Sequence, residues 1–363
     1  MKKKLIIFMP SIEGGGVEKN LFIVTNYLVK KVPKVLLITA SKKFKKKFSK
    51  SLTFISPYSN KWDYKSRRTK YLICLFLLLK EILKDRNQLV FAFQANIYCI
   101  LICKLLGIKI ITRSNSAPAG WSKNFFKRII FKYFLNKADQ VMANSNDFVK
   151  SLKLEFNLKA KCIYNPLNKK EILRKSKLNS KKFFKKNQTL KILNIGRFVE
   201  QKDQITFLKA LNLIKDKINY EAILVGRGDD KIILKKFINK EKLNDKIKLI
   251  DFAENPYPII KQTEILVLTS KYEGLPNVLL EAQVLKKFII SSDCPTGPRE
   301  ILLNGKGGLL FKVGDFKELA KKIIYYQKNK KDLKELVNQS YRQLNRFDYD
   351  SNLNKYLELV RGV

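Results

Sequence analysis

Two pairs of charged residues in the second half of the chain have a spacing that could bind a charged ligand. Arg197 and Lys202 are five residues apart in GRFVEQKD, where the arginine could bind a diphosphate bidentately and the lysine as a point charge. Two solvated cations in a lysine-rich chain are the alternative. Glu273 and Glu281 are eight residues apart in SKYEGLPNVLLEA, and each carboxylate can accept hydrogen bonds from neighbouring hydroxyl groups.

The residues between the two glutamates predict where each one lies. Gly274 and Pro276 disfavour a helix, and Pro276 suits a first helical turn, so Glu273 is expected on a loop and Glu281 on the helix that follows. The amino end of that helix would offer backbone amides to a phosphate. Exposed acids beside a helix start are the alternative, but Glu281 lies within the apolar run VLLEA and would need a partner there.

Two further loops carry glycines that could bring the backbone close to a ligand. The run Gly14-Gly15-Gly16 follows an expected first strand and precedes a helix, an arrangement that lets amides approach a phosphate or a sugar. A tight turn is the alternative for this run. In DCPTGPREI, prolines on both sides of Thr296 and Gly297 predict a rigid bend that could form one wall of a cleft.

Short β-rich runs alternate with longer helical segments along the whole chain. Continuous apolar runs separated by helices are typical of parallel strands buried on both faces. The expected strands are 5–8, 35–39, 89–93, 109–112, 140–143 and 161–164 in the first half, and 191–195, 222–225, 247–250, 265–268, 288–291 and 308–311 in the second. The chain is therefore predicted to be α/β, with two doubly wound, Rossmann-like domains of parallel sheet facing across a cleft.

The domain boundaries follow from the polar, basic stretch 169–187, which contains no expected strand. We predict an amino-terminal domain at 1–168, a basic linker at 169–187, and a second domain at 188–363 that ends in a helical segment. Open parallel sheets bind ligands beyond the carboxyl ends of their strands. All the motifs above follow expected strands, so they are predicted to lie at these edges.

The charge of the chain is unusual, with 74 Lys and Arg against 31 Asp and Glu. Residues 1–190 have a net charge of +33 and residues 191–363 a net charge of +10. A genome-wide preference for lysine would raise both halves alike, so the asymmetry favours a polyanionic surface facing the first half. The longest apolar run, 71–79, is far too short to span a bilayer. We therefore expect peripheral binding to an anionic membrane through 42–50, 61–70 and 121–137.

The segment 121–137, WSKNFFKRIIFKYFLNK, carries five basic residues and no acid. Its aromatic and aliphatic residues recur at helical spacing, which is typical of a basic helix lying in a membrane interface. A helix packed on the domain core is the alternative. A nucleic-acid-binding protein is disfavoured, because no recognisable binding fold is present and the loop motifs would be left unexplained.

The five cysteines lie in apolar surroundings and the chain has no histidine, so reduced buried thiols are expected rather than a zinc site. This composition predicts a cytoplasmic protein, placed by its charge on the inner face of the cell membrane. The only Asp-x-Asp sequence, 348–350, lies far along the chain from the loop motifs. No metal and no cofactor are therefore predicted.

Four motifs, in their order along the chain, resemble those of the family 4 retaining glycosyltransferases of GT-B fold: GRFVEQKD, LVGRGDD, SKYEGLPNVLLEA and DCPTGPREI. Two motifs of the first half, GGGVEKN and ANSNDFVKSL, extend this resemblance over essentially the whole chain. The resemblance implies that Arg197 and Lys202 hold the diphosphate of a nucleotide-sugar donor. It also implies that Glu273 contacts the donor sugar and Glu281 the ribose. CPTGPREI further resembles members that transfer N-acetylhexosamines in surface-polysaccharide assembly, which implies a UDP-linked donor and a glycan or lipid-linked acceptor.

The predicted site therefore has two overlapping groups. Those assigned to catalysis are Arg197, Lys202 and Glu273. Those assigned to donor binding are Gly15, Gly16, Arg197, Lys202, Gly274, Leu275, Asn277, Val278, Glu281 and Gly297. An epimerase or hydrolase acting on sugar nucleotides with the same fold is the alternative function.

The chain departs from its relatives at one position. Many of them have a histidine near the donor sugar in the first domain, whereas the comparable stretch 112–116 reads TRSNS, where Arg113 or Asn115 could take its place. Inversion of configuration needs a general base, most often histidine. Retention by front-face attack does not, because the departing diphosphate can accept the proton of the acceptor, while Arg197 and Lys202 stabilise its charge.

Overall fold

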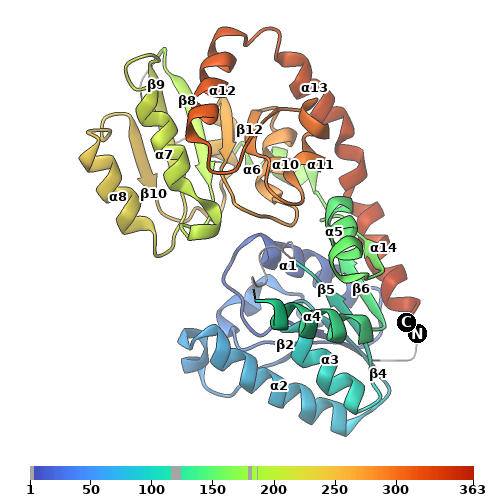
Figure 1. The fold of residues 1–363 in the computed structure, drawn as a ribbon. Helices are drawn as coiled ribbons and strands as arrows, with labels where there is room; N and C mark the ends of the chain where they lie inside the picture. Colours follow the sequence, from blue (N-terminus) through green and yellow to red (C-terminus); the bar gives the residue numbers. More distant parts are fainter. Residues whose placement is uncertain (1–3, 116–123, 179–181, 186) are drawn as a thin grey trace. The chain divides into compact units, whose positions relative to one another are not determined.

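The computed structural model describes residues 4–115, 124–178, 182–185 and 187–363, and the chain forms two compact units (Figure 1). Unit 1 comprises Met1–Pro166 together with Tyr349–Val363, and unit 2 comprises Leu167–Asp348. Each unit contains one sheet in which every described strand pair is parallel. The predicted fold class, α/β with two parallel sheets, is confirmed.

The sheet of unit 1 has seven strands in the order β3-β2-β1-β4-β5-β6-β7. Its strands are β1 (Lys4–Phe8), β2 (Val35–Ile38), β3 (Thr53–Ile55), β4 (Gln88–Ala92), β5 (Lys109–Arg113), β6 (Gln140–Ala143) and β7 (Ala160–Cys162). Its helices are α1 (Gly16–Val29), α2 (Arg67–Lys84), α3 (Asn96–Leu105), α4 (Phe125–Lys137), α5 (Asn146–Phe156) and α14 (Tyr349–Arg361), with 3₁₀ turns at Lys42–Lys47 and Asn60–Tyr64.

Both faces of this sheet are buried, as the continuous apolar strands predict. Leu5 and Ile7 of β1 belong to a core shared with α1 and α14, whereas Ile6 and Phe8 belong to a second core shared with α2, α3, α4 and α5. Side chains of a strand alternate between its two faces, so a strand covered on both sides must be apolar throughout.

The sheet of unit 2 has six strands in the order β10-β9-β8-β11-β12-β13. Its strands are β8 (Leu190–Ile195), β9 (Tyr220–Val225), β10 (Ile247–Ile250), β11 (Ile265–Leu268), β12 (Phe288–Ser292) and β13 (Leu309–Phe311). Its helices are α6 (Lys169–Lys175), α7 (Gln204–Leu213), α8 (Lys231–Lys240), α9 (Tyr257–Gln262), α10 (Asn277–Val284), α11 (Pro298–Ile301), α12 (Phe316–Lys328) and α13 (Lys334–Arg342), with 3₁₀ turns at Glu200–Lys202, Leu303–Gly305 and Gln343–Phe347.

All twelve expected strands are present, with ends within two residues of those predicted. Strand β3 was not predicted; it has three residues and pairs with β2 at the edge of the sheet. Its residues are half-buried or exposed, so it lacks the apolar run that marks the other strands. Among the described residues, no helix is both long and apolar enough to cross a bilayer.

The units differ from the sequence-based domain boundaries in two places. The predicted linker 169–187 begins with helix α6, and Phe184 within it is buried, so this stretch is part of unit 2. The last helix, α14, belongs to unit 1 rather than to the second domain. Its buried side of Leu353, Tyr356 and Val360 completes the core shared with α1, a contact between distant segments that no local pattern predicts.

Tyr356 is the residue of α14 whose removal should test this assignment. The side chain is fully buried, and its ring centroid lies 6.3 Å from that of Phe91 in β4. We expect Tyr356→Ala to lower the free energy of unfolding of unit 1 by about 3 kcal/mol or more, because it leaves a cavity in the core. The control is Lys355→Ala at the neighbouring exposed residue, which should change the free energy of unfolding by less than about 0.5 kcal/mol. Urea denaturation measures both, and equal effects would contradict the assignment.

Candidate functional site

The predicted cationic and acidic residues of unit 2 lie at the point where the strand order of its sheet reverses. From β8 the chain builds β9 and β10 on one side, and then returns to add β11, β12 and β13 on the other. The loops after β8 and β11 therefore diverge at the carboxyl edge of the sheet, which is where open α/β sheets bind ligands. Arg197 and Lys202 follow β8, and Glu273 follows β11.

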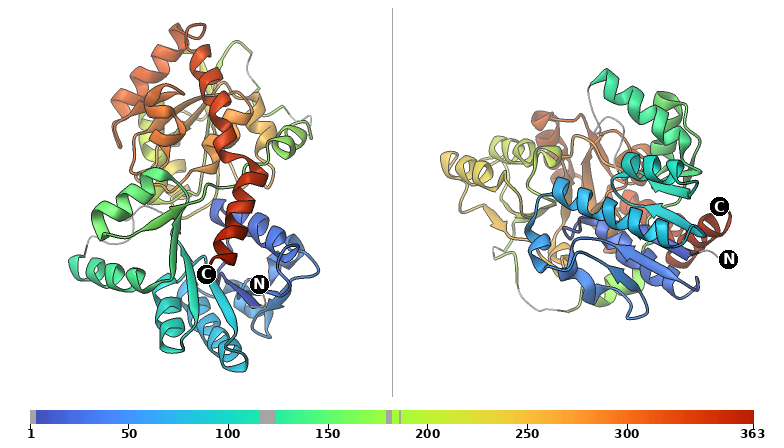
Figure 2. Two further views of the ribbon diagram at one scale, coloured as in Figure 1. Left: turned by 90° about the vertical axis from the view of Figure 1, so that its right-hand side faces the viewer. Right: turned by 90° about the horizontal axis from the view of Figure 1, so that it is seen from below.

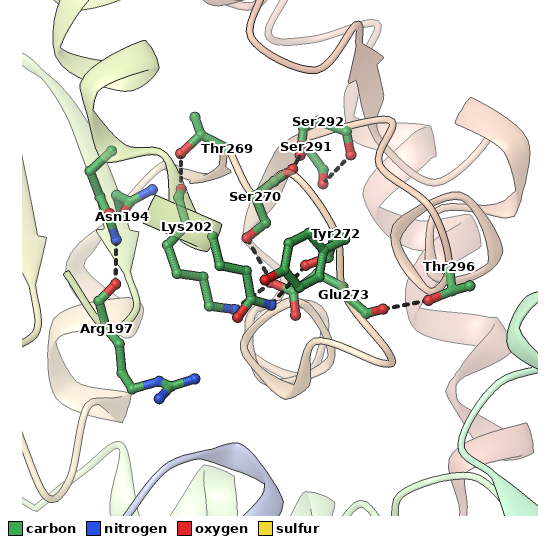
Figure 3. Close-up of polar contacts among 12 residues, drawn as sticks. Asn194, Arg197, Lys202, Thr269, Ser270, Tyr272, Glu273, Ser291, Ser292 and Thr296 are labelled. Atoms are coloured by element: carbon green, nitrogen blue, oxygen red, sulfur yellow. Dashed lines mark hydrogen bonds and ion pairs between the residues drawn. The ribbon is translucent and has the colours of Figure 1, made fainter. Parts of the chain in front are cut away.

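A pair of opposite charges joins these two loops (Figure 3). Lys202 Nζ forms an ion pair with Glu273 Oε1, and both side chains are largely buried, with 17% and 8% exposed. Ser270 Oγ donates a hydrogen bond of 2.6 Å to the same carboxylate oxygen. Removing either charge would leave the other buried without its partner, so the pair sets the relative position of the loops.

The backbone of both loops is tied down around this pair. Thr269 Oγ1 donates to the carbonyl oxygen of Lys202 at 2.8 Å. The side chain of Gln201 donates to the carbonyl oxygen of Tyr272 at 2.8 Å. The backbone amide of Lys271 donates to the carbonyl oxygen of Gln201, also at 2.8 Å. These contacts run between segments about 70 residues apart and hold Lys202 beside Glu273 without using the charged groups.

The main chain of Glu273 is held from the opposite side by the loop that follows β12. Its amide donates to the carbonyl oxygen of Pro295 at 3.2 Å, and its carbonyl oxygen accepts from Thr296 Oγ1 at 2.5 Å (Figure 3). Ser292 Oγ donates to the carbonyl oxygen of Ser270 at 2.7 Å. Glu273 is thus held through both its main chain and its carboxylate before any ligand binds.

Gly297 has a structural reason to be glycine. Its φ is +86°, and a Cβ there would lie 2.5 Å from the carbonyl oxygen of Gly274 and 2.8 Å from Pro276 Cδ. Only a residue without a side chain lets the loop after β12 pack this closely against the loop before α10. Its predicted contact with a donor remains a prediction.

Helix α10 begins at Asn277, directly after Pro276, as expected. Gly274 and Leu275 are buried on the loop before it, whereas Asn277 and Val278 are half-buried in its first turn. Glu281 lies one turn further along and is buried. The five predicted residues from Gly274 to Glu281 therefore occupy one loop and the first half of one helix.

Arg197 is exposed, but its backbone is fixed. Gln204 Nε2 donates to its carbonyl oxygen at 2.9 Å, and the next residue, Phe198, is buried in the core of unit 2. The Phe198 amide donates to the carbonyl oxygen of Arg227 at 2.8 Å, and a Cβ on Gly226 would lie 1.9 Å from the carbonyl oxygen of Gly196. The glycine in LVGRGDD thus allows close packing of the loops after β8 and β9.

Cys294 lies in the same environment and is chemically quiet. Burial, and then the negative charge of Glu273, raise the pKa of its thiol well above the usual value. The thiolate is the nucleophilic form, so this cysteine is not a nucleophile at neutral pH. No hydrogen-bonding role was predicted for Ser270, Gln201 or Thr296, although all three lie within the quoted motifs.

The side chain of Glu18 packs against the glycine loop of unit 1. Glu18, in the first turn of α1, is buried, and its Oε1 accepts from the amide of Glu13 at 3.4 Å. A Cβ on Gly15 would lie 2.9 Å from Glu18 Oε2. A carboxylate at the amino end of a helix takes the place of a bound anion, which favours the tight-turn interpretation of this loop. Donor contacts of Gly15 and Gly16 remain predictions.

The two candidates for the missing histidine differ in accessibility. Arg113 is only 1% exposed, donates from Nη2 to Asn165 Oδ1 at 2.8 Å, and stacks over the ring of Phe93 at 5.2 Å. Asn115 is half-buried on the loop after β5, and its Nδ2 donates to the carbonyl oxygen of Phe93 at 2.7 Å. Arg113 is therefore held within unit 1, and Asn115 is the better placed of the two for contact with a ligand.

Within the described part of the chain, no group of three or more His, Cys, Asp or Glu side chains could hold a metal ion. The cationic groups at the edge of the unit 2 sheet include Arg197 and Lys202 on the loop after β8, and Lys271 on the loop after β11, which pairs with Glu200 at 2.9 Å. Such an arrangement can stabilise a diphosphate by charge alone.

The packing of Gly297 gives a prediction for the stability of unit 2. We expect Gly297→Ala to lower the free energy of unfolding by about 2 kcal/mol or more, because the positive φ and the contact with Gly274 both oppose a Cβ. Gly305→Ala is the matched control: its φ is +95°, but no atom lies within 4 Å of the new Cβ, so only about 1 kcal/mol is expected. If urea denaturation gave equal losses of unfolding free energy for the two variants, the close contact between Gly297 and Gly274 would not contribute to the effect.

Comparison with known proteins agrees with this arrangement. Residues 175–343 match the family of glycosyl transferases group 1. A glycosyltransferase of Methanocaldococcus jannaschii is 30% identical over 261 residues, which cover 66% of this chain and 63% of that protein. The GalNAc-GalNAc-diNAcBac-PP-undecaprenol α-1,4-N-acetyl-D-galactosaminyltransferase of Campylobacter jejuni is 25% identical over 378 residues, covering 99% of both chains.

The fold has close counterparts among solved structures. Anabaena HepE, solved in complex with UDP, superposes with a TM-score of 0.77 and 16% identity, covering 99% of this chain and 100% of that one. A similarity at this level of identity concerns the fold. The fold of this chain is therefore of the GT-B type, as predicted, and its sequence is similar to those of the group 1 glycosyltransferases of family 4.

Proposed function

We propose that this protein transfers a sugar from a UDP-linked donor to a lipid-linked or other membrane-associated glycan acceptor, with retention of configuration, in surface-polysaccharide synthesis. The observation that carries this proposal is the Lys202–Glu273 pair at the strand-order reversal of unit 2. This pair supports the proposal because a lysine can bind a diphosphate and a carboxylate beside it can accept hydrogen bonds from sugar hydroxyls. Unit 2 is thus the donor-binding part, and unit 1 the acceptor-binding part.

The comparisons support the finer details of this proposal. The Campylobacter jejuni relative is named for an N-acetylgalactosamine transfer to an undecaprenol diphosphate-linked glycan, and HepE was solved with UDP. We therefore propose UDP as the nucleotide and an N-acetylhexosamine as the sugar. The proposed acceptor is a polyprenyl-linked glycan on the inner face of the cell membrane, by analogy with the acceptor in the name of the Campylobacter jejuni relative.

The proposed reaction needs no basic residue to take up the proton. The bond between the anomeric carbon and the diphosphate oxygen breaks, the acceptor oxygen bonds to that carbon on the same face, and the acceptor proton passes to the departing diphosphate. Lys202 and Arg197 stabilise the negative charge that develops on this leaving group. An ammonium group has three donors, so Lys202 can bind a phosphate oxygen while it keeps its contact with Glu273.

The two glutamates have separate proposed roles. Glu273 accepts hydrogen bonds from the donor sugar with the oxygens that Ser270 and Lys202 leave available. Glu281 lies one helical turn further along α10 and accepts from the ribose hydroxyls. Asn115 of unit 1 is the proposed replacement for the histidine of many relatives.

The proposed acceptor requires that the protein reach a membrane surface. The first of the three basic segments, 42–50, contains a 3₁₀ turn, and its lysines are exposed or half-buried. The second segment, 61–70, runs into α2, and the third, 121–137, contains α4. Trp121 and its two neighbours 122 and 123 lie outside the described residues. We propose electrostatic attraction of these segments to anionic lipid, which added salt would weaken.

The cationic loop gives the first prediction about activity. Arg197→Ala and Lys202→Ala should each lower kcat/KM by about 10²–10³, because each removes a positive group that stabilises the leaving diphosphate. Lys235→Ala, which removes an exposed lysine from α8 in the same unit, should leave kcat/KM within about twofold. Steady-state kinetics with a UDP-sugar checks this, and unchanged kcat/KM in both loop variants would remove the diphosphate assignment.

The glutamates should separate nucleotide binding from transfer. Glu281→Gln should weaken UDP binding about tenfold or more, because charged acceptors make stronger hydrogen bonds than neutral ones. Glu273→Gln should lower the rate of transfer more than the affinity for UDP, because UDP lacks the sugar that Glu273 contacts and the backbone contacts of both loops still hold Lys202 in place. Titration calorimetry with UDP and a transfer assay test the two variants together. Equal UDP affinity of the wild type and Glu281→Gln would rule out the ribose role.

The overall proposal is tested by identifying donor and product. We expect UDP-N-acetylhexosamines to raise the melting temperature more than GDP- or ADP-sugars do, because ligand binding stabilises the folded state by mass action. With a polyprenyl diphosphate-linked glycan as acceptor, NMR coupling constants should show an α linkage formed from the α donor. A β linkage would overturn retention, and consumption of the donor without any acceptor would indicate an epimerase or hydrolase instead.

A further inference from the structure

Helices α2, α3 and α4 cover one face of the unit 1 sheet and leave apolar side chains on their outer sides. Their inner sides supply Cys74, Cys99 and Leu135 to the core beneath. On α2 the outer side is a row of residues four apart: Arg68, Leu72, Phe76 and Lys80. Leu72 is 71% exposed and Phe76 62% exposed, so the middle of this row is apolar and its ends are cationic.

The same pattern continues over the two neighbouring helices. Helix α3 contacts both α2 and α4, and the view from below shows the three next to one another (Figure 2). The outer sides of α3 and α4 carry further exposed apolar and aromatic side chains. These are Tyr98, Leu101, Leu105, Phe126, Ile129, Ile130 and Tyr133. We call the outer side of these three helices the α2–α4 face.

The charge of the α2–α4 face is almost entirely positive. The three helices contain ten Lys and Arg residues and a single acid, Glu81. Glu81 is buried and pairs with Lys4 at 3.1 Å and with Lys84 at 2.5 Å, so it adds no negative charge to the surface. Lys70 is buried, and Arg67, Lys104 and Arg128 each pair with an acid on another segment. The exposed positive charge therefore comes from the two ends of the α2 row, Arg68 and Lys80, and from Lys127, Lys132 and Lys137 of α4.

We propose that the α2–α4 face docks on an anionic lipid bilayer, with Leu72, Phe76 and Ile130 inserted between the lipids. Exposed apolar patches of this kind are uncommon on monomeric proteins that bind nothing. Aliphatic and phenyl groups enter the acyl region, whereas Tyr98 and Tyr133 suit the interface and the lysines reach the head groups. A second copy of the chain would bring an equally cationic face, which repulsion opposes.

This inference rests on the proposed function, because it places unit 1 against the membrane that would hold a lipid-linked acceptor. It also shifts the main contact. The sequence pointed to the charge of 42–50, 61–70 and 121–137 and to an aromatic helix in the last of them, whereas the structure adds apolar outer sides on α2 and α3 beside α4. Apolar insertion resists salt, so part of the binding should persist when charges are screened.

The experiment is vesicle flotation with the full chain. The probes are vesicles of phosphatidylcholine alone and of phosphatidylcholine mixed with phosphatidylglycerol, at low and high salt. The test variant is Leu72→Gln/Phe76→Gln/Ile130→Gln, and the matched control is Ile232→Gln/Ile233→Gln on the exposed side of α8 in unit 2. Melting temperature and UDP binding show that each variant is folded.

We expect the wild type and the α8 control to float with the anionic vesicles, and the triple variant to lose affinity at least about tenfold for each side chain that inserts. The proposal is overturned if the triple variant floats like the wild type, or if the wild type floats with neither vesicle at low salt. It is equally overturned if the wild type is a dimer that the triple variant dissociates, since the face would then be a subunit interface.

A second measurement separates this inference from the proposed function. Transfer of sugar to a water-soluble glycan acceptor should be equal in the wild type and the triple variant, because the altered residues lie outside the proposed site. If the wild type floats but transfers no sugar, only the function is wrong. If it transfers sugar but does not float, only the docking face is wrong.

Discussion

The buried ion pair between Lys202 and Glu273 is the interaction on which the rest of the site depends. A buried pair of charges contributes to stability only when its remaining hydrogen-bonding capacity is satisfied. Ser270 donates such a hydrogen bond to the carboxylate of Glu273, whereas Thr269 and Gln201 join the backbones of the loops that follow β8 and β11. The site is consequently assembled by the folding of unit 2, before a ligand arrives.

Close backbone packing also fixes the neighbouring loops. Gly226 lets the loop after β9 pack against the one after β8, and Gly297 lets the loop after β12 pack against the one before α10. Four loops from four strands therefore hold one another in place. Short glycine contacts of this kind explain why motifs rich in glycine surround the charged residues, without each glycine touching a ligand.

Much of the fold could be predicted because parallel strands covered on both faces must be apolar throughout. The exceptions are informative. Strand β3 is a half-exposed edge strand, and α14 buries Tyr356 against β4 more than 250 residues away along the chain, so neither leaves a local signal. The glycine run before α1 was predicted to approach a phosphate or a sugar, with a tight turn as the alternative, and the position of Glu18 at that helix end favours the turn.

The sequence by itself determined the fold class, the order of strands and loops, and the charged residues that follow β8 and β11, because burial and chemistry restrict residue types locally. Only the tertiary structure decided that Lys202 contacts Glu273, that Arg113 is buried while Asn115 stays accessible, and that the apolar sides of α2, α3 and α4 share one face. These facts depend on contacts between segments far apart in the chain, which local periodicity does not encode.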